Sequence, residues 1–529
     1  MSSRPDPIPG LPLVVQLSFA GSRSLFNREQ YPNIDQCIFT DKIRAQLKNI
    51  LEGLPTRLGL LHQQIFFCGI SQIAIGADTV FTAVCRDLSI PQRIFLPQHF
   101  HEYLSAVGSD GPDFNPEEQT AAQRLLESQH IIQERVVATS SDRHVRFEEV
   151  NQELARVADV MVCLVAEGGG RAGGSDDFIE EGEKRKRPLL EIRVAVGDDN
   201  QPTLTQVWHR REAFLKPQMP EELSTLQTDL KGVPALVEYC KPLKTFASTQ
   251  AGWMRTVFDY SAIIIVGTHF LATLCAVVAL QLDNSWLPWL LLCELLLLFI
   301  GFATHTYLHR RKASEKWSMV RLVAEVARSA QQLVGVRAYL SHMFTLPLPQ
   351  SLRPLLRTLN VLHLRETRRL NADTLEERRN HYIQLRMEQQ IKYYEDHLTS
   401  AKRRRRILNM SFVIGSISAM VATLTKLLIH VNRFSFSEFQ EHRLSSVFGS
   451  LAIVLPVLAV AALSLAASRD LEARVQTFSE MLDFLDGHVQ NLRQAKTDHA
   501  FATLALEAEA RLLGETATWY SRRAFTGIS

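Results

Sequence analysis

The hydrophobic positions of this chain follow two different patterns. Between residues 11 and 195, short runs rich in β-branched and aromatic residues alternate with stretches of helical periodicity. Strands are predicted at residues 13–19, 64–69, 92–96, 133–138, 159–165 and 188–194. Helices are predicted at residues 35–53, 77–88, 116–128, 143–157 and 176–186. This alternation predicts a doubly wound, Rossmann-like α/β domain with parallel strands.

Four long apolar segments follow, at residues 260–282, 285–308, 407–431 and 444–468. Each is long enough to cross a bilayer, which needs about 20 apolar residues as a helix. Their only acidic or basic residues are Glu294 and Lys426. Helices buried in a soluble core rarely sustain such runs four times. The sequence therefore predicts an all-α transmembrane domain with four spanning helices.

Basic residues next to these segments indicate their orientation. Residues 310–312 close the second segment, residues 402–406 precede the third, and Arg469 and Arg474 follow the fourth. Because such clusters stay in the cytoplasm, both termini are expected there. The predicted organisation is an α/β domain (1–210), a linker or cytoplasmic helix (211–259), a hairpin of spans (260–308), a cytoplasmic helical region (309–406), a second hairpin (407–468) and C-terminal cytoplasmic helices (469–529).

The cytoplasmic stretches read as helices. The segment from residue 371 to 406 has Asp373 or Thr374 as its N-cap, acids in the first turn and bases in the last, which suits the helix dipole. The tail places apolar residues such as Phe478 and Leu482 at helical spacing. Both stretches suit packing in a homo-oligomer.

Composition narrows the functions. The chain of 529 residues is 46% hydrophobic and has a formal charge of +2, which argues against a nucleic-acid partner. Mean hydropathy of -0.03 averages polar domains with the apolar spans. The seven cysteines are dispersed without a Cys/His cluster, which argues against a disulfide framework and against a structural metal. No cofactor is expected.

Three loops at predicted strand ends carry small and polar residues. The first has Gly21, Ser22 and Arg23; the second has Gly69 and Ser71 and then Gly76 and Asp78 opening a helix; the third runs from Glu167 to Ser175 and includes Gly169, Gly173 and Gly174. Glycine lets backbone amides approach a phosphate, and arginine pairs with one. The third loop reads either as such a cradle or as a linker. Because ligands bind at the carboxyl ends of parallel strands, the fold is expected to bring the three loops together.

Several other residues have two interpretations. Arg143, at a helix start beside this edge, either binds phosphate or lies on a solvated helix face. Glu294 and Lys426 either form a pore or gating pair, or the lysine extends to the membrane surface while the glutamate is protonated or bonded to backbone.

The α/β domain resembles the SLOG superfamily, the Rossmann-like nucleotide-binding domains related to DprA and to the LOG-type cytokinin-activating enzymes. The resemblance rests on "FAGSRSLF", "GISQIAIGADTVFTAVC", "RHVRFEEVNQELARVADVMVCLVAEGGG" and "GGSDDFIEEGEKRKRPLLEI". It implies ligand contacts from Gly21, Ser22, Arg23, Ser71, Gly76, Asp78, Gly173, Gly174 and Ser175. The line GGSDDFIEE lacks the second glycine–threonine step of the LOG-type run, so no catalytic residue is assigned.

The membrane half resembles SLATT-type transmembrane modules, through "ERRNHYIQLRMEQQIKYYEDHLTSAKRRRR" and the terminal "EAEARLLGETATWYSRR". Together the resemblances imply a sensor of a nucleotide-derived second messenger, such as a cyclic nucleotide or an ADP-ribose derivative, that perturbs the bacterial inner membrane in anti-phage defence. Its expected partners are membrane lipids, the messenger and the enzyme that makes it. The alternative is a membrane-tethered phosphoribohydrolase or glycosidase, with Arg143 and Glu181 as charge-stabilising and acid/base groups.

Overall fold

The computed structural model describes residues 8–27, 29–61, 64–105, 107–108, 111–112, 114–166, 174–281, 286–369, 374–432 and 438–525. The chain forms two compact units. The sheet unit consists of Met1–Leu243 and Val326–Asp373, and the helical unit consists of Lys244–Glu325 and Thr374–Ser529.

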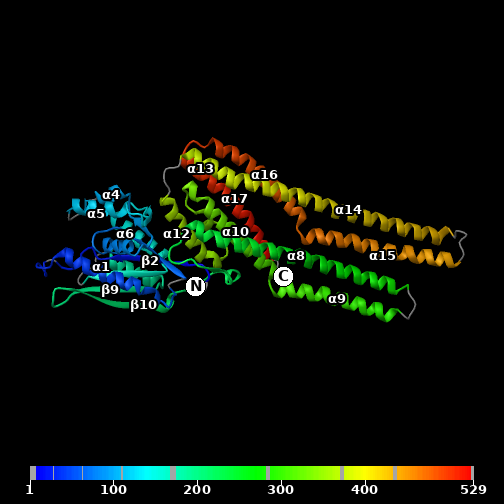
Figure 1. Ribbon diagram of the computed structural model, residues 1–529, viewed down its shortest axis with the longest axis horizontal. Helices are drawn as coiled ribbons and strands as arrows, with labels where there is room; N and C mark the ends of the chain where they lie inside the picture. Colours follow the sequence, from blue (N-terminus) through cyan, green and yellow to red (C-terminus); the bar gives the residue numbers. More distant parts are fainter. Residues whose placement is uncertain are drawn as a thin grey trace, which may run out of the picture. The chain divides into compact units, whose positions relative to one another are not determined.

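A seven-stranded sheet organises the sheet unit (Figure 1). Its strand order is β10-β9-β8-β2-β3-β4-β7. The strands are β2 Leu13–Gly21, β3 Ile65–Ser71, β4 Gln92–Leu96, β7 Ile131–Val136, β8 Val160–Ala166, β9 Leu189–Val196 and β10 Pro202–His209. All neighbours pair in parallel except β10, which pairs antiparallel with β9. The predicted parallel α/β sheet is confirmed, and the antiparallel edge strand is an addition to it.

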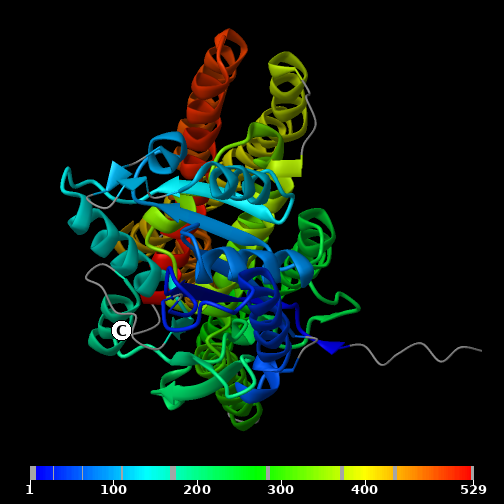
Figure 2. The same ribbon diagram turned by 90° about the vertical axis from the view of Figure 1, so that its left-hand side faces the viewer.

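Helices cover both faces of this sheet, as the turned view in Figure 2 also shows. On one face, the core joins β2 and β3 to α1 (Gln36–Glu52) and α3 (Ala77–Asp87). On the other, it joins β2 and β8 to α6 (Arg143–Val157) and α7 (Ser175–Lys184). The central strand β2 is buried along almost its whole length, which explains its continuous apolar run.

Shorter elements complete the sheet unit. The helices are α2 Leu54–Arg57, α4 Phe100–Leu104, α5 Pro116–Leu126, α11 His342–Thr345 and α12 Arg353–Arg369, and the strand pairs are β1 Ile8–Pro9 with β11 Gln227–Thr228, and β5 Val107–Gly108 with β6 Gly111–Pro112. The predicted strands and helices of residues 13–194 are present with bounds shifted by at most two residues.

Helix α12 contacts the chain at the amino ends of β2 and β8. The hydroxyl of Thr358 accepts a hydrogen bond of 2.9 Å from the backbone N–H of Val14, and Arg357 contacts Asp159 at 2.6 Å. The domain ranges drawn from the sequence therefore differ from the structure: the pairing of β1 with β11 extends the sheet unit beyond residue 210, and residues 326–373 belong to it. Contacts over such chain separations leave no local pattern in the sequence.

The helical unit contains four helices long and apolar enough to cross a membrane. The helices that carry these segments are α8 Leu236–Ala279, α9 Leu287–Arg310, α14 Gln389–Asn432 and α15 Glu438–Ser468. Only 6% of the most apolar window in α9 is buried, and Leu295 and Phe299 are 65% and 67% exposed. In a water-soluble protein, such apolar side chains would be buried against other parts of the chain. These helices therefore fit a multi-pass membrane protein.

Small residues bring these helices together in pairs (Figure 1). Gly301 of α9 lies against Thr268 and His269 of α8, where a Cβ would approach both side chains to 2.8 Å. Gly415 of α14 faces Ala459 of α15 in the same way, with 3.2 Å to its Cβ. Close backbone approach through small residues is typical of helix pairs in membranes.

The remaining helices of this unit are α10 Ala313–Gln332, which begins in it, and α13 Leu375–Tyr382, α16 Leu471–Gln494 and α17 Asp498–Phe525. Thr374 is the N-cap of α13 and forms a capping box with Glu377, which confirms one of the two predicted caps; Asp373 lies outside the described residues. A π-helical segment, Ile383–Glu388, links α13 to α14.

Arg386 lies in this π-helical segment and is 1% exposed. Its guanidinium donates hydrogen bonds of 2.6 and 2.8 Å to Glu509 and one of 2.6 Å to Glu325. The hydroxyl of Tyr382 also donates to Glu509, at 3.1 Å. Two carboxylates thus neutralise one buried guanidinium, as burial of a charge requires.

Candidate functional site

The strand order reverses at β2, and the carboxyl end of this strand is where such a sheet is expected to form a ligand crevice. The chain passes from β2 outward through β3, β4 and β7, and then returns to the other side of β2 with β8. In open α/β sheets, ligands bind at the carboxyl ends of the strands where the order reverses in this way. The loops that follow β2, β3 and β8 are the three loops with glycine and polar residues.

Ser22 links the first of these loops to the other two. Its backbone N–H donates to the carbonyl of Leu164 at 2.9 Å, and its hydroxyl accepts from the N–H of Ala166 at 3.1 Å. Its carbonyl accepts from the N–H of Ala77 at 3.1 Å. Because these bonds satisfy Ser22 within the protein, its role is to fix the loop after β2 against β8 and the start of α3.

Two glycines permit this close approach. A Cβ on Gly21 would lie 2.4 Å from the Cβ of Ala77 and 2.7 Å from the carbonyl oxygen of Leu164. Gly76 has a φ of +90°, and its Cβ would lie 2.1 Å from the carbonyl oxygen of Arg23. Both positions therefore require glycine on steric grounds.

Asp78 lies in the first turn of α3, behind the loop that carries Arg23. Its side chain is 4% exposed, and Oδ2 accepts a hydrogen bond of 3.3 Å from the N–H of Ala74. Its Oδ1 has no hydrogen-bond partner among the described residues. Burial raises the pKa of Asp78 to about 7, although the hydrogen bond from Ala74 and the positive charge of Arg23 act in the opposite direction. This carboxyl group is thus poised to change charge near neutral pH.

The loop after β8 is described only at its end. Gly169 and Gly173 lie outside the described residues. Gly174 is the N-cap of α7, and its carbonyl accepts a hydrogen bond of 3.2 Å from the side chain of Asn151 in α6; Ser175 begins α7 and is 3% exposed. Asn151 was not among the predicted site residues. The sequence could have indicated Asn151 as a supporting residue, because it is polar and lies near the buried apolar residues Val150 and Leu154 of the same helix.

Gly69 and Ser71 lie within β3 rather than beyond its end. A Cβ on Gly69 would lie 3.0 Å from the sulfur of Cys85, so this glycine packs against α3. The hydroxyl of Ser71 donates to the carbonyl of Gln72 at 2.5 Å and accepts from the side chain of Gln92 at 2.9 Å. Both residues hold the strand in place in the structure.

Arg143 and Glu181 lie on different helices of the same face. Arg143 is the first residue of α6, whose N-cap Asp142 accepts hydrogen bonds from the N–H groups of His144 and Val145. Glu181 lies within α7, where Arg185 donates to its Oε1 at 2.5 Å. Glu181 therefore forms an ion pair with Arg185, which lies one helical turn further along the chain.

Glu294 and Lys426 lie on α9 and α14. The Nζ of Lys426 packs against Gly449 of α15, where a Cβ would lie 3.0 Å from it. Across the described ranges, neither a hydrogen bond nor an ion pair joins Glu294 to Lys426. The gating pair of Glu294 and Lys426 therefore stays a prediction.

No family model matches this chain, and neither a curated protein nor a solved structure matches it. The candidate site therefore rests on the residues and their geometry. At the crevice beside β2 these supply a tightly constrained backbone, the cation Arg23 and a carboxyl group with a raised pKa, a combination suited to binding a phosphate-bearing small molecule.

Proposed function

We propose that this protein is a membrane effector gated by a nucleotide-derived second messenger. The messenger binds in the sheet unit at the carboxyl ends of β2, β3 and β8, and the four apolar helices then permeabilise the bacterial inner membrane as an anti-phage response. The observation that carries the proposal is that β2, β3 and β8, whose following loops carry the glycine and polar residues, lie side by side where the strand order reverses, in a chain whose described residues also include four apolar helices.

The chemistry of the crevice favours a phosphate-bearing ligand. The start of α3 follows Gly76 directly, so the positive end of the helix dipole favours an anion there. Arg23 adds a guanidinium suited to bidentate phosphate binding. Because its pKa is about 7, Asp78 is largely neutral at slightly acidic pH and then does not repel an anion.

The resemblance to SLOG and SLATT modules gives the proposal its biological setting. The basic residues beside the apolar segments favour a cytoplasmic position for the sheet unit, and nucleotide messengers are made in the cytoplasm. The enzyme that makes the messenger is a functional partner. Glu181, the acid/base candidate of the alternative hydrolase, is already paired with Arg185, which favours binding over catalysis.

Gating sets an energy requirement. To convert a rare open state into the dominant one, the ligand must bind the open state more tightly by about 5.5 kcal/mol. Several ligand sites in a homo-oligomer reach this value with a smaller difference at each site. We therefore propose that the active form is a homo-oligomer.

A binding screen tests the ligand class. The full-length protein in detergent is titrated by calorimetry with cyclic dinucleotides and with ADP-ribose. We expect one of them to bind, and Arg23→Ala to weaken that binding about tenfold or more, since a charge-assisted hydrogen bond is lost. Absence of binding by every member of the panel, or equal binding by Arg23→Ala, contradicts the proposal.

The same preparation separates sensing from hydrolysis. It is incubated with NAD and nucleoside monophosphates, and free base is measured by chromatography. The proposal predicts no release above a sample without protein. Release that depends on Glu181 would establish the enzyme instead.

A further inference from the structure

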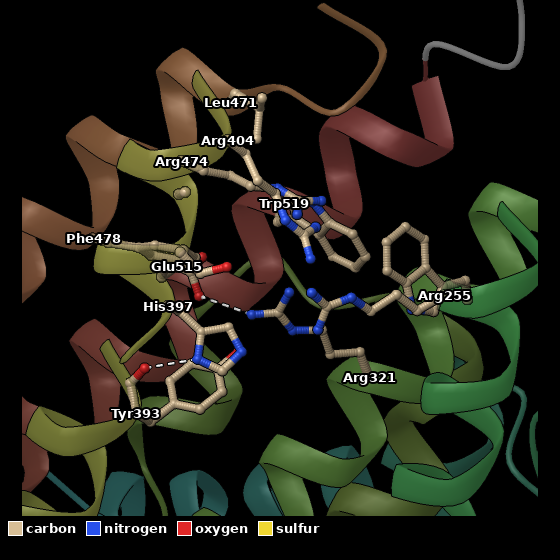
Figure 3. A pocket seen from close by; sticks show the side chains of 13 residues that line it. Arg255, Arg321, Tyr393, His397, Arg404, Leu471, Arg474, Phe478, Glu515 and Trp519 are labelled. Carbon is tan, nitrogen blue, oxygen red and sulfur yellow. Dashed lines mark hydrogen bonds and ion pairs between the residues drawn. The ribbon is translucent and has the colours of Figure 1, made fainter. Parts of the chain in front are cut away.

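A second candidate anion site lies within the helical unit, in a pocket lined by four arginines (Figure 3). Arg255 comes from α8, Arg321 from α10, Arg404 from α14 and Arg474 from α16, while α17 contributes Glu515 and Trp519. In Figure 3 the nitrogen atoms of the arginines face one another across the middle of the view. Four helices thus direct guanidinium groups into one pocket, and a fifth helix contributes its carboxylate.

The pocket has an excess of positive charge. Against the four guanidinium groups, its lining contains a single carboxylate, Glu515, which lies 3.8 Å from Arg321. Burial lowers the pKa of Arg474 from its ordinary value, and the positive charges of Arg255, Arg321 and Arg523 lower it further, while the negative charge of Asp259 acts in the opposite direction. The pocket lining therefore holds more guanidinium groups than carboxylates, and an anion bound among them would reduce their mutual repulsion.

Acids that flank the pocket are paired with arginines, and one of them, Asp259, lies 4.0 Å from Arg255 of the pocket and 3.9 Å from Arg469. Asp470 contacts Arg523 at 2.7 Å, and Glu472 contacts Arg405 at 2.9 Å. Among the residues that the structure describes, no carboxylate lies within ion-pair distance of Arg404 or Arg474. These two side chains are therefore the cations that a ligand would neutralise.

Aromatic side chains shape the wall of the pocket. Trp317 and Trp519 meet edge to face with centroids 4.8 Å apart, and the guanidinium of Arg321 lies 4.9 Å from the centroid of the Trp519 ring. Such cation–π contacts fix the arginine heads. The pocket encloses about 70 Å³. Because roughly 10–15 Å³ of such space holds one water, this is room for a phosphate group.

The pocket lies at the basic ends of the apolar segments. Arg255 precedes the segment that begins at residue 260, Arg404 precedes the one at 407, and Arg474 follows the one that ends at 468. A group bound by all three would tie together the ends of both hairpins.

We infer that this arginine pocket binds the phosphate group of an anionic ligand at the membrane surface. The phosphate belongs to a lipid headgroup or to a soluble phosphorylated molecule, and the chemistry of recognition is the same for both. The inference is independent of the messenger site in the sheet unit. Bidentate guanidinium contacts supply the affinity.

The experiment uses the full-length protein with two probes. In one arm, native mass spectrometry counts phosphatidylglycerol bound in mixed micelles, with phosphatidylcholine as the neutral lipid. In the other, calorimetry follows inorganic pyrophosphate. We expect at least one probe to bind, and Arg404→Gln to weaken its binding about tenfold or more. Binding of phosphatidylglycerol alone identifies a lipid source, and binding of pyrophosphate identifies a soluble one.

Arg403→Gln is the matched control, because Arg403 is the exposed neighbour of Arg404 on α14 and does not line the pocket. It removes the same charge at the same level of the helix, so we expect less than about a twofold change. Arg404 is itself exposed, so its replacement leaves folding intact. Equal weakening by both variants, or absence of binding by both probes, overturns the inference.

Discussion

The two candidate anion sites of this protein differ in the atoms that would face the ligand. Beside β2, the site is formed by backbone at Gly21 and Gly76, with Arg23 as its cation and Asp78 as a nearby buried acid. In the helical unit, side chains of four arginines converge from different helices. Binding at the first site depends mainly on backbone geometry, and binding at the second depends on positive charge. Changes in backbone geometry should therefore abolish binding at the first site, where loss of the Arg23 charge also weakens it, and changes in charge alone should abolish binding at the second.

Arg386 contrasts with the arginines of the pocket, because it also lies in the helical unit but already forms ion pairs with two carboxylates, Glu325 and Glu509. Arg386→Met leaves Glu509 buried without a cation and should lower the free energy of unfolding by about 3–5 kcal/mol. Denaturant unfolding of the full chain in detergent measures this. The double variant Arg386→Met/Glu509→Leu should recover most of the loss. If the single variant is as stable as wild type, the cluster does not stabilise the unit.

Asp78 gives the stability of the sheet unit a pH dependence. The folded carboxyl keeps its proton to about pH 7, whereas an unfolded one releases it near 3.8. The folded state binds more protons between these values, so stability should fall as pH rises from 4 to 7, by up to about 4 kcal/mol. Hydrogen exchange of β2 and β3 peptides at each pH reports it. Asp78→Asn should remove the trend; a trend that persists excludes Asp78 as its source.

A substitution at Gly76 tests whether the backbone at the messenger site leaves room for a side chain. Gly76→Ala places a Cβ 2.1 Å from the carbonyl oxygen of Arg23 at a φ of +90° and should cost about 3 kcal/mol. Gly232→Ala is the matched control, since Gly232 has a φ of +62° but no atom within 4 Å of its Cβ position. It should cost about 1 kcal/mol. Equal unfolding energies of the two variants would remove the steric argument.

Salt distinguishes the two sites by a smaller effect. Raising ionic strength from about 0.05 to 0.5 M should weaken anion binding in the arginine pocket roughly fivefold, because Arg404 is exposed. Backbone amides beside β2 are fixed dipoles, so binding there should weaken less than about twofold. Titration of each probe at both salt concentrations measures this difference. The reverse order would contradict the assignment of charge and shape to the two sites.

Local patterns predicted most of the fold. The strands of residues 13–194, the four apolar segments and the Thr374 cap are each encoded within a few neighbouring residues. The position of α12 against β2 was not predictable, because Thr358 and Val14 meet across 344 residues. The basic residues near the spans were visible in sequence. Their convergence into one pocket depends on the packing of five helices and could not be read from it.

The candidate messenger site was predicted in part for the same reason. Hydrophobic periodicity predicted where β2 ends and where α3 begins, and Gly21 and Gly76 occupy these two positions. The internal bonding of Ser22 and Ser71, and the support that Asn151 gives to Gly174, depend on side chains from other elements.

Ligand-gated release of dye tests the central claim most directly. The full-length protein is reconstituted in liposomes loaded with a self-quenching dye, and the nucleotide that binds in the calorimetric screen is added from the side of the sheet unit. We predict rapid release with wild type and none with Arg23→Ala inserted to the same level. Release without nucleotide, or equal release by both proteins, would contradict gating through the crevice beside β2.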